Sequence, residues 1–412
     1  MLRWCELLGG LMAKILVLGG NFAGLTAALE TRRHLKDAGH TVTVISQRDY
    51  FLFVPSLIWV PFSEREITDI TLPVEPILRK RGIEFVHATA TRVNQYENYV
   101  ETNAGRFDYD YLVIATGPKL DYSISGVGPD NGYTACICDP EGALDTRERF
   151  ENLVDNPGPV VIGATQAAGC VGAAYEFLFN AEFNLRKRGV RKKVEITWIT
   201  PEPFLGHFGI EGIAGGNTML RKMFAMLEIN FVTNTKIDHV GQDEITLGDG
   251  RALPFAFSML MPPFLGQDVV SNSPGLGNAK GYVPVNGAYQ HKEFPNVFAA
   301  GIAVDVPAPF TTPVPLGIPK TGFPADEEAK IAAYNVANLV NARVDLKVKE
   351  FGHIPGVCIL DAGHKEVYLV ANHLFKPRQF AALIPNPVYD GGKRALEKYF
   401  LWKTRNGLSY LT

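Results

Sequence analysis

Cysteines are the side chains of this 412-residue chain that are best suited to redox or nucleophilic chemistry. They stand at Cys5, Cys136, Cys138, Cys170 and Cys358, so only the fold can bring distant ones together. Their number is odd and too small for a disulfide-based scaffold of this length. A buried cysteine most often serves as a small apolar residue, so a chemical role needs support from its surroundings.

Neither a metal site nor a reductase-type dithiol is indicated. Cys136-x-Cys138 is half of a possible metal site, but no second pair of ligands follows at zinc-finger spacing, so we expect no metal. A C-x-x-x-x-C pair near the first glycine turn is also missing, which argues against chemistry of the glutathione-reductase type.

A glycine turn near the start predicts a dinucleotide site. Residues 14–18 and 41–45 read as strands, and residues 25–37 read as the helix between them. The turn keeps Gly19 and Gly24, with Asn21 in the middle place, where Asn tolerates left-handed backbone. The helix N-terminus would face a pyrophosphate. Ser46 stands where an acidic residue usually holds the ribose, and it is either a weaker ribose ligand or an ordinary turn serine.

Two later strands narrow the cofactor to FAD. YDYLVIATG (109–117) and NVFAAG (296–301) each end at a glycine and enclose an inserted segment, a pattern typical of flavoproteins with two dinucleotide domains. The insert has its own strand, turn, helix (about 172–188) and strand (194–199). Because Thr165 replaces its second glycine and Cys170 occupies its helix start, we expect no NAD(P)H there.

The predicted fold is α/β, with two Rossmann-like units in a glutathione-reductase-like arrangement. We assign FAD binding to 12–125 and 276–340, the second unit to 126–275, and a C-terminal quinone and membrane-interface region to 341–412. Residues 1–11 read as an extension without a structural role. Residues 393–405 predict a helix whose aromatic face and basic border suit a membrane surface, or equally a helix packed on the core.

Composition excludes several classes of protein. The chain is 46% hydrophobic and 20% charged, as in an ordinary folded protein, and its net charge of −3 gives a nucleic-acid partner no support. No run of about 18 apolar residues predicts a membrane-spanning helix.

Several longer strings resemble sulfide:quinone oxidoreductases, from Lys14 to about Lys403. They include VLGGNFAGLTAA, DYFLFVPSLIWV, GATQAAGCVGAAYEF, TPEPFLGHFGI, PKTGFPADEEAKIAAYNVA and EKYFLWK. The resemblance implies an FAD enzyme, peripheral to a membrane and homo-oligomeric, that oxidises sulfide to zero-valent or polymeric sulfur. Electrons would pass to a membrane quinone, on a membrane side that the sequence does not define.

The resemblance also implies roles for three cysteines. Cys170 in GCVGAAYE and Cys358 in GVCIL match two redox cysteines, which we expect to form a bridge across the flavin. Cys138 in TACICD matches the third, with Cys136 as an extra thiol that blurs the assignment, while Cys5 has no counterpart. A helix N-terminus at Cys170 is expected to lower the pKa of its thiol.

Other residues follow from the same match. Glu176 is a candidate proton acceptor or a surface carboxylate, and His207 is a candidate proton carrier or a structural histidine. Lys320, ahead of a predicted helix at about 325–340, could stabilise reduced flavin or be a solvated lysine. The expected flavin-binding residues are Gly19, Asn21, Phe22, Ala23, Gly24, Ser46, Ala115, Thr116, Gly117, Gly301, Lys320, Thr321 and Gly322. The expected quinone-binding residues are Val357, Leu396, Tyr399 and Phe400, with Leu396 where family members often have an aromatic residue.

Three other functions compete with this interpretation. A flavocytochrome c-type sulfide dehydrogenase flavoprotein shares the cysteines but is normally exported, and this chain has no convincing signal sequence. A type II NADH:quinone dehydrogenase needs the NADH turn that Thr165 and Cys170 spoil. A flavin-fold scaffold without activity would be favoured only by a purified protein that lacks flavin.

Overall fold

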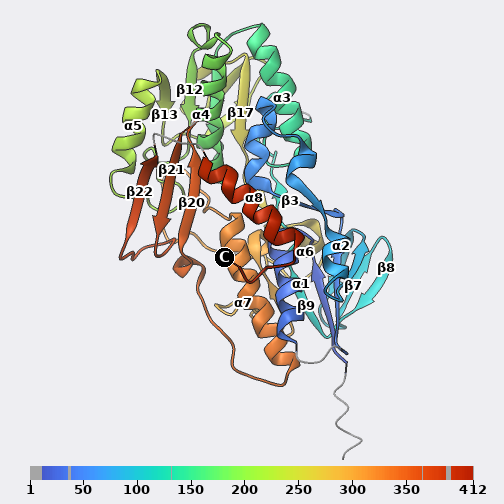
Figure 1. Ribbon diagram of the computed structural model, residues 1–412. Coiled ribbons are helices and arrows are strands. Elements are labelled where there is room, and N and C mark those ends of the chain that lie inside the picture. Colours follow the sequence, from blue (N-terminus) through green and yellow to red (C-terminus); the bar gives the residue numbers. More distant parts are fainter. Residues whose placement is uncertain (1–11, 36–38, 131, 364, 387–390, 412) are drawn as a thin grey trace, which may run out of the picture.

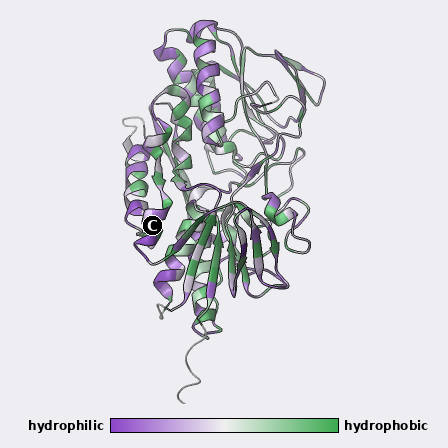
Figure 2. Ribbon diagram, turned by 90° about the vertical axis from the view of Figure 1, so that its right-hand side faces the viewer, coloured by the Kyte–Doolittle hydropathy of each residue, from purple (hydrophilic) through white to green (hydrophobic). Residues whose placement is uncertain are grey.

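Two α/β units make up most of the molecule (Figure 1). The structure is a computed structural model that describes residues 12–35, 39–130, 132–363, 365–386 and 391–411. In Figure 2, hydrophobic residues follow the strands in the middle of the molecule, and hydrophilic residues dominate the outer turns of the helices. This distribution is expected when sheets are covered by helices on both faces.

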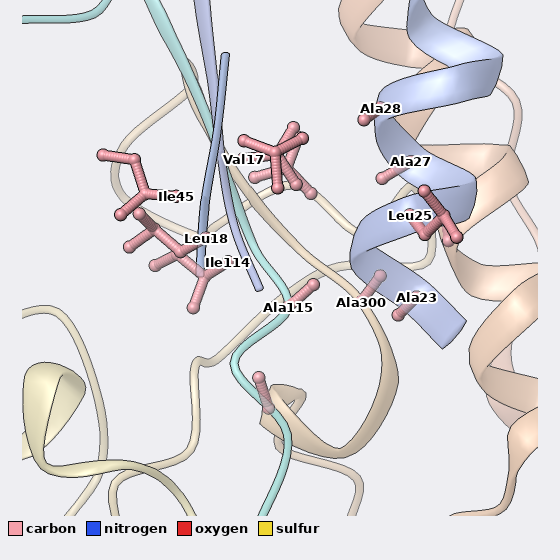
Figure 3. Packing of buried hydrophobic residues seen from close by; sticks show 14 of the residues in the cluster. Val17, Leu18, Ala23, Leu25, Ala27, Ala28, Ile45, Ile114, Ala115 and Ala300 are labelled. Carbon is pink, nitrogen blue, oxygen red and sulfur yellow. The ribbon is translucent and has the colours of Figure 1, made fainter. Parts of the chain in front are cut away.

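The first unit is built on a parallel five-stranded sheet. Its order is β19 (Val297–Ala299), β9 (Tyr111–Ile114), β1 (Lys14–Leu18), β2 (Thr41–Ser46) and β5 (Glu84–His87). Helices α1 (Phe22–His34) and α7 (Gly322–Val340) pack against each other beside this sheet. Small side chains of α1, such as Ala27 and Ala28, let the helix lie close to Val17 (Figure 3). The two predicted strands that enclose the insert are therefore neighbours.

The second unit has a parallel four-stranded sheet. Its order is β13 (Ile229–Val232), β12 (Ile196–Ile199), β11 (Val160–Ala164) and β17 (Phe257–Met261). Helices α3 (Pro140–Asp155) and α4 (Val171–Lys187) pack on this sheet, and α5 (Gly216–Met226) contacts its edge strand β13. Both predicted βαβ units are present, so the predicted fold class is confirmed.

Short elements complete the two units. The small sheets are β3 (Tyr50–Leu52) with β4 (Thr71–Pro73), β6 (Ala90–Asn94) with β7 (Tyr99–Thr102) and β8 (Gly105–Asp108), β10 (Lys119–Leu120) with β18 (Phe264–Leu265), and β14 (Ile237–Val240) with β15 (Glu244–Leu247) and β16 (Ala252–Pro254). The remaining helices are α2 (Val74–Arg79), α6 (Asp268–Ser271) and the 3-10 turns η1 (Val54–Phe62), η2 (Ile67–Ile70), η3 (Arg191–Lys193), η4 (Gly301–Ala303) and η5 (Phe351–His353).

The chain returns to the first unit before residue 276. Val269, Val270 and Leu276 belong to the core of the first unit, and the Ser273 hydroxyl accepts a hydrogen bond from the backbone of Val93 at 2.7 Å. Residues 268–275, which the sequence placed in the second unit, therefore pack on the first.

A three-stranded antiparallel sheet carries Cys358. It consists of β20 (Gly356–Asp361), β21 (Glu366–Ala371) and β22 (Ala381–Asn386). Cys358 lies opposite Leu369, which lies opposite Leu383, so these three share one face. Leu369 and Leu383 pack on the core of the second unit, so this is the inner face. Val357, one residue away, points to the other face.

Helix α8 (Gly391–Arg405) is the C-terminal helix for which the sequence allowed either a membrane surface or packing on the core. Its aromatic Phe400 is buried, with ring centroids 5.6 Å from Phe53 and 6.0 Å from Phe22. Trp402 alone among its large apolar residues is mostly exposed. The apolar side of α8 thus covers the protein core, the packed alternative that the sequence left open.

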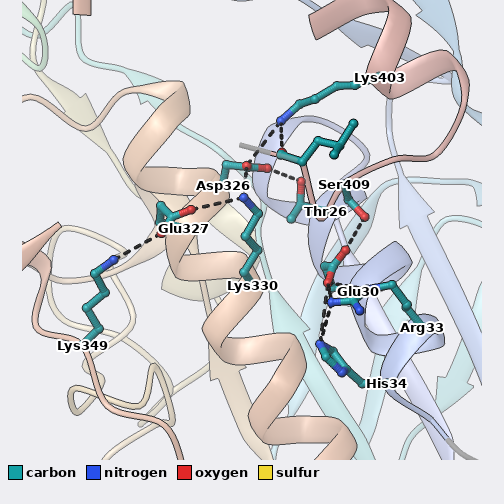
Figure 4. A network of polar contacts seen from close by, with 11 residues as sticks. Thr26, Glu30, Arg33, His34, Asp326, Glu327, Lys330, Lys349, Lys403 and Ser409 are labelled. Carbon is teal, nitrogen blue, oxygen red and sulfur yellow. Dashed lines mark hydrogen bonds and ion pairs between the residues drawn. The ribbon is translucent and has the colours of Figure 1, made fainter. Parts of the chain in front are cut away.

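Buried charges also hold α8 in place. The Lys403 ammonium lies 3.6 Å from Asp326 of α7, and Asp326 also pairs with Lys330 at 3.0 Å (Figure 4). After the helix ends, the Ser409 hydroxyl donates to Glu30 of α1 at 2.6 Å. Because buried charges are tolerated only with partners, these pairs fix the C-terminal segment on the first unit.

No helix among the described residues is long and apolar enough to cross a membrane.

Candidate active site

A cradle of glycines lies at the carboxyl edge of the first sheet. Gly19 has a φ of +111°, and a Cβ there would lie 2.2 Å from the Ala115 carbonyl oxygen. A Cβ on Gly24 would lie 2.0 Å from the carbonyl oxygen of Gly19, so α1 approaches the turn as closely as its backbone allows. This is the close packing that a dinucleotide pyrophosphate requires.

Asn21 does not adopt the left-handed backbone conformation that the sequence predicted for it. Its backbone is extended (φ −103°), so the left-handed residue of the turn is Gly19. The Asn21 amide oxygen accepts from the backbone of Leu52 at 3.1 Å instead of capping α1. No acidic residue lies in the first turn of α1, whose N–H groups and positive end therefore suit a phosphate.

Further polar groups at this edge fit a dinucleotide. The Thr116 hydroxyl is buried without a hydrogen-bond partner, beside Ala115 and Gly117 in the loop after β9. The Ser46 hydroxyl donates to the Arg48 carbonyl at 2.7 Å and accepts from its backbone N–H. Ser46 behaves here as a turn serine with one acceptor position left, so its ribose contact stays a prediction. The residues present fit a dinucleotide cofactor.

Lys320 and Glu328 place buried charges near the start of α7. The Lys320 ammonium donates to the Val304 carbonyl at 2.6 Å and lies 3.7 Å from the centre of the Tyr282 ring. Burial lowers the pKa of Lys320 to about 8 and raises the pKa of Glu328 to about 8. Gly301, with φ +72°, donates its backbone N–H to Glu328. Lys320 is therefore half-buried and bound by protein groups, and it is not a solvated lysine.

The N-terminus of α7 packs directly on the glycine turn. A Cβ on Gly322 would lie 3.0 Å from the Phe22 ring, and one on Gly301 would lie 2.9 Å from Ala23. The predicted Thr321 is the N-cap of α7, but its side chain makes no capping bond. The expected flavin-binding residues from both ends of the chain thus gather at one edge of the sheet.

Cys170 and Cys358 lie on two elements that meet. Cys170 is the N-cap of α4, and Cys358 is on β20, which packs on α4. Next to them, a Cβ on Gly172 would lie 3.9 Å from Leu360. The charge of Cys170 also raises the pKa of Cys358, so the two sulfurs are close enough to interact. Both are free thiols here, so their disulfide stays a prediction.

The expected low pKa of the Cys170 thiol is wrong. Desolvation raises the pKa, and the backbone N–H groups of Ala173 and Gly172 at the helix start only partly offset it. At Cys358, desolvation and the nearby Glu176 carboxylate raise the pKa to about 12. Both sulfurs therefore favour the neutral thiol, or a bond to another sulfur, over the thiolate.

Glu176 joins the two cysteine-bearing elements. One of its oxygens, Oε1, accepts from the backbone N–H of Asp361 on β20 at 2.8 Å and from the Lys393 ammonium of α8 at 2.6 Å. Glu176 is buried, so desolvation raises its pKa, while Lys393 acts in the opposite direction. The predicted alternative of a surface carboxylate is therefore wrong.

Cys136 and Cys138 form a second pair of neighbouring thiols. The interaction between the two thiols lowers the pKa of Cys136 and raises that of Cys138. Cys138 also lies 3.2 Å from the Met261 sulfur, and the charge of Cys170 contributes to its raised pKa. Cys138 is thus the member of the pair on the side of Cys170, whereas Cys136 is fully buried.

The His207 side chain makes its ring contacts with phenylalanine residues and not with the cysteines. It is buried between Phe310, 4.8 Å away between ring centres, and Phe204 at 5.3 Å. Its Nδ1 is buried without a hydrogen-bond partner, and burial lowers the pKa of the ring. A proton-carrying role for His207 stays a prediction.

The expected quinone residues are spread over β20 and α8, which contact each other. Val357 is 52% exposed, Leu396 and Tyr399 are half-buried, and Phe400 is buried. Since Val357 and Cys358 point to opposite faces of β20, an apolar ligand at Val357 would lie on the side away from the thiol.

Protein atoms cover the turn of the second unit. The Ala167 backbone N–H donates to Pro315 at 2.7 Å, and a Cβ on Gly317 would lie 2.1 Å from the Ala168 carbonyl oxygen. The Thr165 hydroxyl is turned to Met261. Residues 315–317 therefore pack directly on this turn, and the expected lack of NAD(P)H binding stays a prediction.

Sequence reasoning missed several residues of the site. Lys393, Asp361, Glu366 and Trp59 all contact the Glu176 cluster or its partners. No spacing signal could have found them, because they come from four elements that are distant in sequence. No group of three or more His, Cys, Asp or Glu residues within the described ranges is placed to hold a metal ion.

Comparison with known proteins agrees with the fold and identifies the family. The family model for pyridine nucleotide-disulphide oxidoreductases matches residues 13–314. The chain is 36% identical over 404 residues to the sulfide-quinone reductase of Aquifex aeolicus, covering 96% of this chain and 92% of that protein. It therefore belongs to the pyridine nucleotide-disulphide oxidoreductase family and, within it, to the sulfide:quinone oxidoreductases.

Comparison with solved structures also shows that the fold is that of a sulfide:quinone oxidoreductase. The crystal structure of the Aquifex aeolicus sulfide:quinone oxidoreductase superposes with a TM-score of 0.91 at 35% identity, over 96% of this chain and 92% of the other. A type II NADH:quinone oxidoreductase from Staphylococcus aureus is 32% identical, but only over 46% of this chain and 49% of that protein. The similarity to the sulfide-oxidising protein thus spans both units and the C-terminal region.

Proposed function

We propose that this protein is a flavin-dependent sulfide:quinone oxidoreductase. The observation that carries the proposal is the meeting of Cys170 and Cys358 around one buried Glu176–Lys393 pair, in a chain whose nearly full-length relative is a sulfide-quinone reductase. The family and the glycine cradle support a flavin, and the two-part dinucleotide site supports FAD. When bound, this group accepts two electrons from sulfur and delivers them to quinone.

The cysteines provide the sulfur chemistry. In the oxidised protein, HS⁻ attacks Cys170 of a Cys170–Cys358 disulfide, which leaves a persulfide on Cys170 and a thiolate on Cys358. Cys358 then bonds to the outer sulfur of the persulfide, a two-electron oxidation in which the S–H proton would pass to Glu176 and the bound flavin would take up the two electrons. The sulfur atom stays in the bridge, and further cycles lengthen or release it. Because the pKa of Cys358 is about 12, its thiolate is a strong nucleophile once it forms.

The remaining residues hold protons and charge. Glu176, ionised beside Lys393, is the proposed acceptor for the proton of the persulfide. Cys138 is the proposed third functional cysteine, since it is the member of its pair near Cys170. Lys320, through its half-buried ammonium near the start of α7, is the proposed partner of the negative charge on reduced flavin.

The quinone side is proposed on the outer face of β20. Val357 and Ile384 lie on this face and are 52% and 49% exposed, and the Phe380 ring ahead of β22 is 54% exposed. Quinones are apolar membrane solutes, so an exposed apolar surface beside the site supports peripheral attachment to a membrane. A homo-oligomer remains part of the proposal.

An anaerobic absorbance titration tests the function. Sulfide should bleach the flavin band, and a short-chain ubiquinone should restore it, while NADH should leave the band unchanged because residues 315–317 pack on the second turn. Bleaching by NADH but not by sulfide would overturn the proposal in favour of a type II NADH:quinone dehydrogenase. Restoration only by a cytochrome would favour the flavocytochrome alternative.

A further inference from the structure

Lys393 is buried near the start of α8 and is not among the residues expected at the site from the sequence. Its exposed fraction is 3%, and that of its partner Glu176 is 7%. Lysine is almost never buried this deeply unless its charge is paired. The short contact of 2.6 Å between Nζ and Oε1 shows that this pair is direct.

Three elements meet at the single oxygen Oε1 of Glu176. Glu176 lies on α4, six residues after Cys170, which caps that helix. Asp361, whose backbone N–H binds the same oxygen, lies on β20 three residues after Cys358. The carboxylate is therefore a bridge between the two elements that carry the redox cysteines, and Lys393 closes it from α8.

Other contacts fix the direction of Lys393. Its backbone N–H donates to Glu366 of β21 at 2.7 Å, and its ammonium lies 5.5 Å from the centre of the Trp59 ring. The Trp59 indole N–H in turn donates to the Asp361 carboxylate at 2.7 Å. The guanidinium groups of Arg65 and Arg394 each lie 5.0 Å from the centre of the Trp59 ring. The ammonium is thus held against Glu176 and is not free to swing to solvent.

We propose that Lys393 is a positioning residue of the sulfur site, whose ammonium locks the Glu176 carboxylate onto Asp361 and so fixes Cys358 against Cys170. This inference rests on the proposed function, since it concerns how that site is assembled. Sulfur exchange between two side chains demands close alignment, and a displacement of about 1 Å can slow such a step on the order of a hundredfold.

Oxidative cross-linking of the reduced holoenzyme tests the proposal. Diamide oxidises the two thiols to a disulfide, and the Cys170–Cys358 peptide is followed by mass spectrometry. K393M and E176A should each slow cross-linking on the order of tenfold or more, because each removes the lock. E176Q should cross-link at least as fast as the wild type, because its amide oxygen can still accept from Asp361 and Lys393 and because loss of the negative charge lowers the pKa of Cys358. K398M is the matched control, an exposed lysine on the same helix, and should have no effect.

The pH dependence of Cys358 alkylation shows whether the Lys393 ammonium acts through its charge or only stabilises the position of the helix. The ammonium lowers the pKa of Cys358, so E176Q/K393M should alkylate Cys358 with a higher pH midpoint than E176Q alone. A folded, flavin-containing K393M that cross-links at the wild-type rate overturns the proposal, as does a K398M that slows it equally. If K393M fails to fold, E176A decides in the same assay. Neither sulfide nor quinone is present, so the result is independent of the titration that tests the proposed function.

Discussion

The thiol of Cys358 should resist alkylation at neutral pH, because its sulfur is desolvated although part of the residue reaches the surface. Its pKa is raised from 9.0 to about 12, first by desolvation and then by Glu176. Three pH units correspond to about a thousandfold less thiolate at pH 8, and the thiolate is the species that reacts. Iodoacetamide should therefore modify Cys358 roughly a thousandfold more slowly than an ordinary exposed cysteine.

The assay follows the rate of carbamidomethylation by peptide mapping of the reduced holoenzyme from pH 7 to 10.5. The logarithm of the rate should rise with a slope of one throughout, without a plateau. Because the shape of this profile does not depend on how easily the reagent enters, it separates pKa from accessibility. A plateau near pH 9 would refute the reasoning. E176Q provides the internal check, since removing this negative charge must lower the midpoint.

Three other variants test the cradle, the core and a buried carboxyl. G24A places a methyl group 2.0 Å from a carbonyl oxygen, so flavin content, read from the ratio of visible to 280 nm absorbance, should fall on the order of tenfold. F400A should destabilise by about 3–5 kcal/mol and lower the melting temperature by roughly 6–20 °C, whereas the exposed W402A should change it little. Burial raises the pKa of Glu202 from 4.5 to about 7, so the folded protein binds this proton more tightly than the unfolded chain. The contribution of Glu202 to the free energy of unfolding is therefore complete below pH 4.5 and falls by about 3 kcal/mol as the pH rises to 7. E202Q should flatten that fall in denaturant titrations between pH 4.5 and 7; an equal fall in both proteins would contradict the assignment.

The packing of α8 shows why some predictions were left open. Its sequence carries Phe400, Trp402 and several basic residues, and both a membrane helix and a core helix satisfy such a pattern. Lys393, Glu397 and Lys403 are all buried, each paired with a group from another element. Helical periodicity gives no sign of these partners, so only the tertiary structure could choose between the two faces.

The pKa of the Cys170 thiol could likewise not be predicted from the sequence. Its place at a helix start was correctly predicted, and that local feature by itself lowers a pKa. The net direction is opposite, because surrounding elements desolvate the sulfur. Local dipoles can be inferred from the sequence, whereas the degree of hydration depends on everything that packs around the group.

The sequence by itself determined the two dinucleotide-type units, the glycine cradle and the candidate cysteines. These features rest on short-range rules: strands and helices follow hydrophobic periodicity, and turns follow glycine positions such as Gly19 and Gly24. The tertiary structure alone decided that Glu176, Asp361 and Lys393 meet at one oxygen between Cys170 and Cys358. The contacting residues are separated by 185 and 217 positions, and contacts at that range arise only when the whole fold closes.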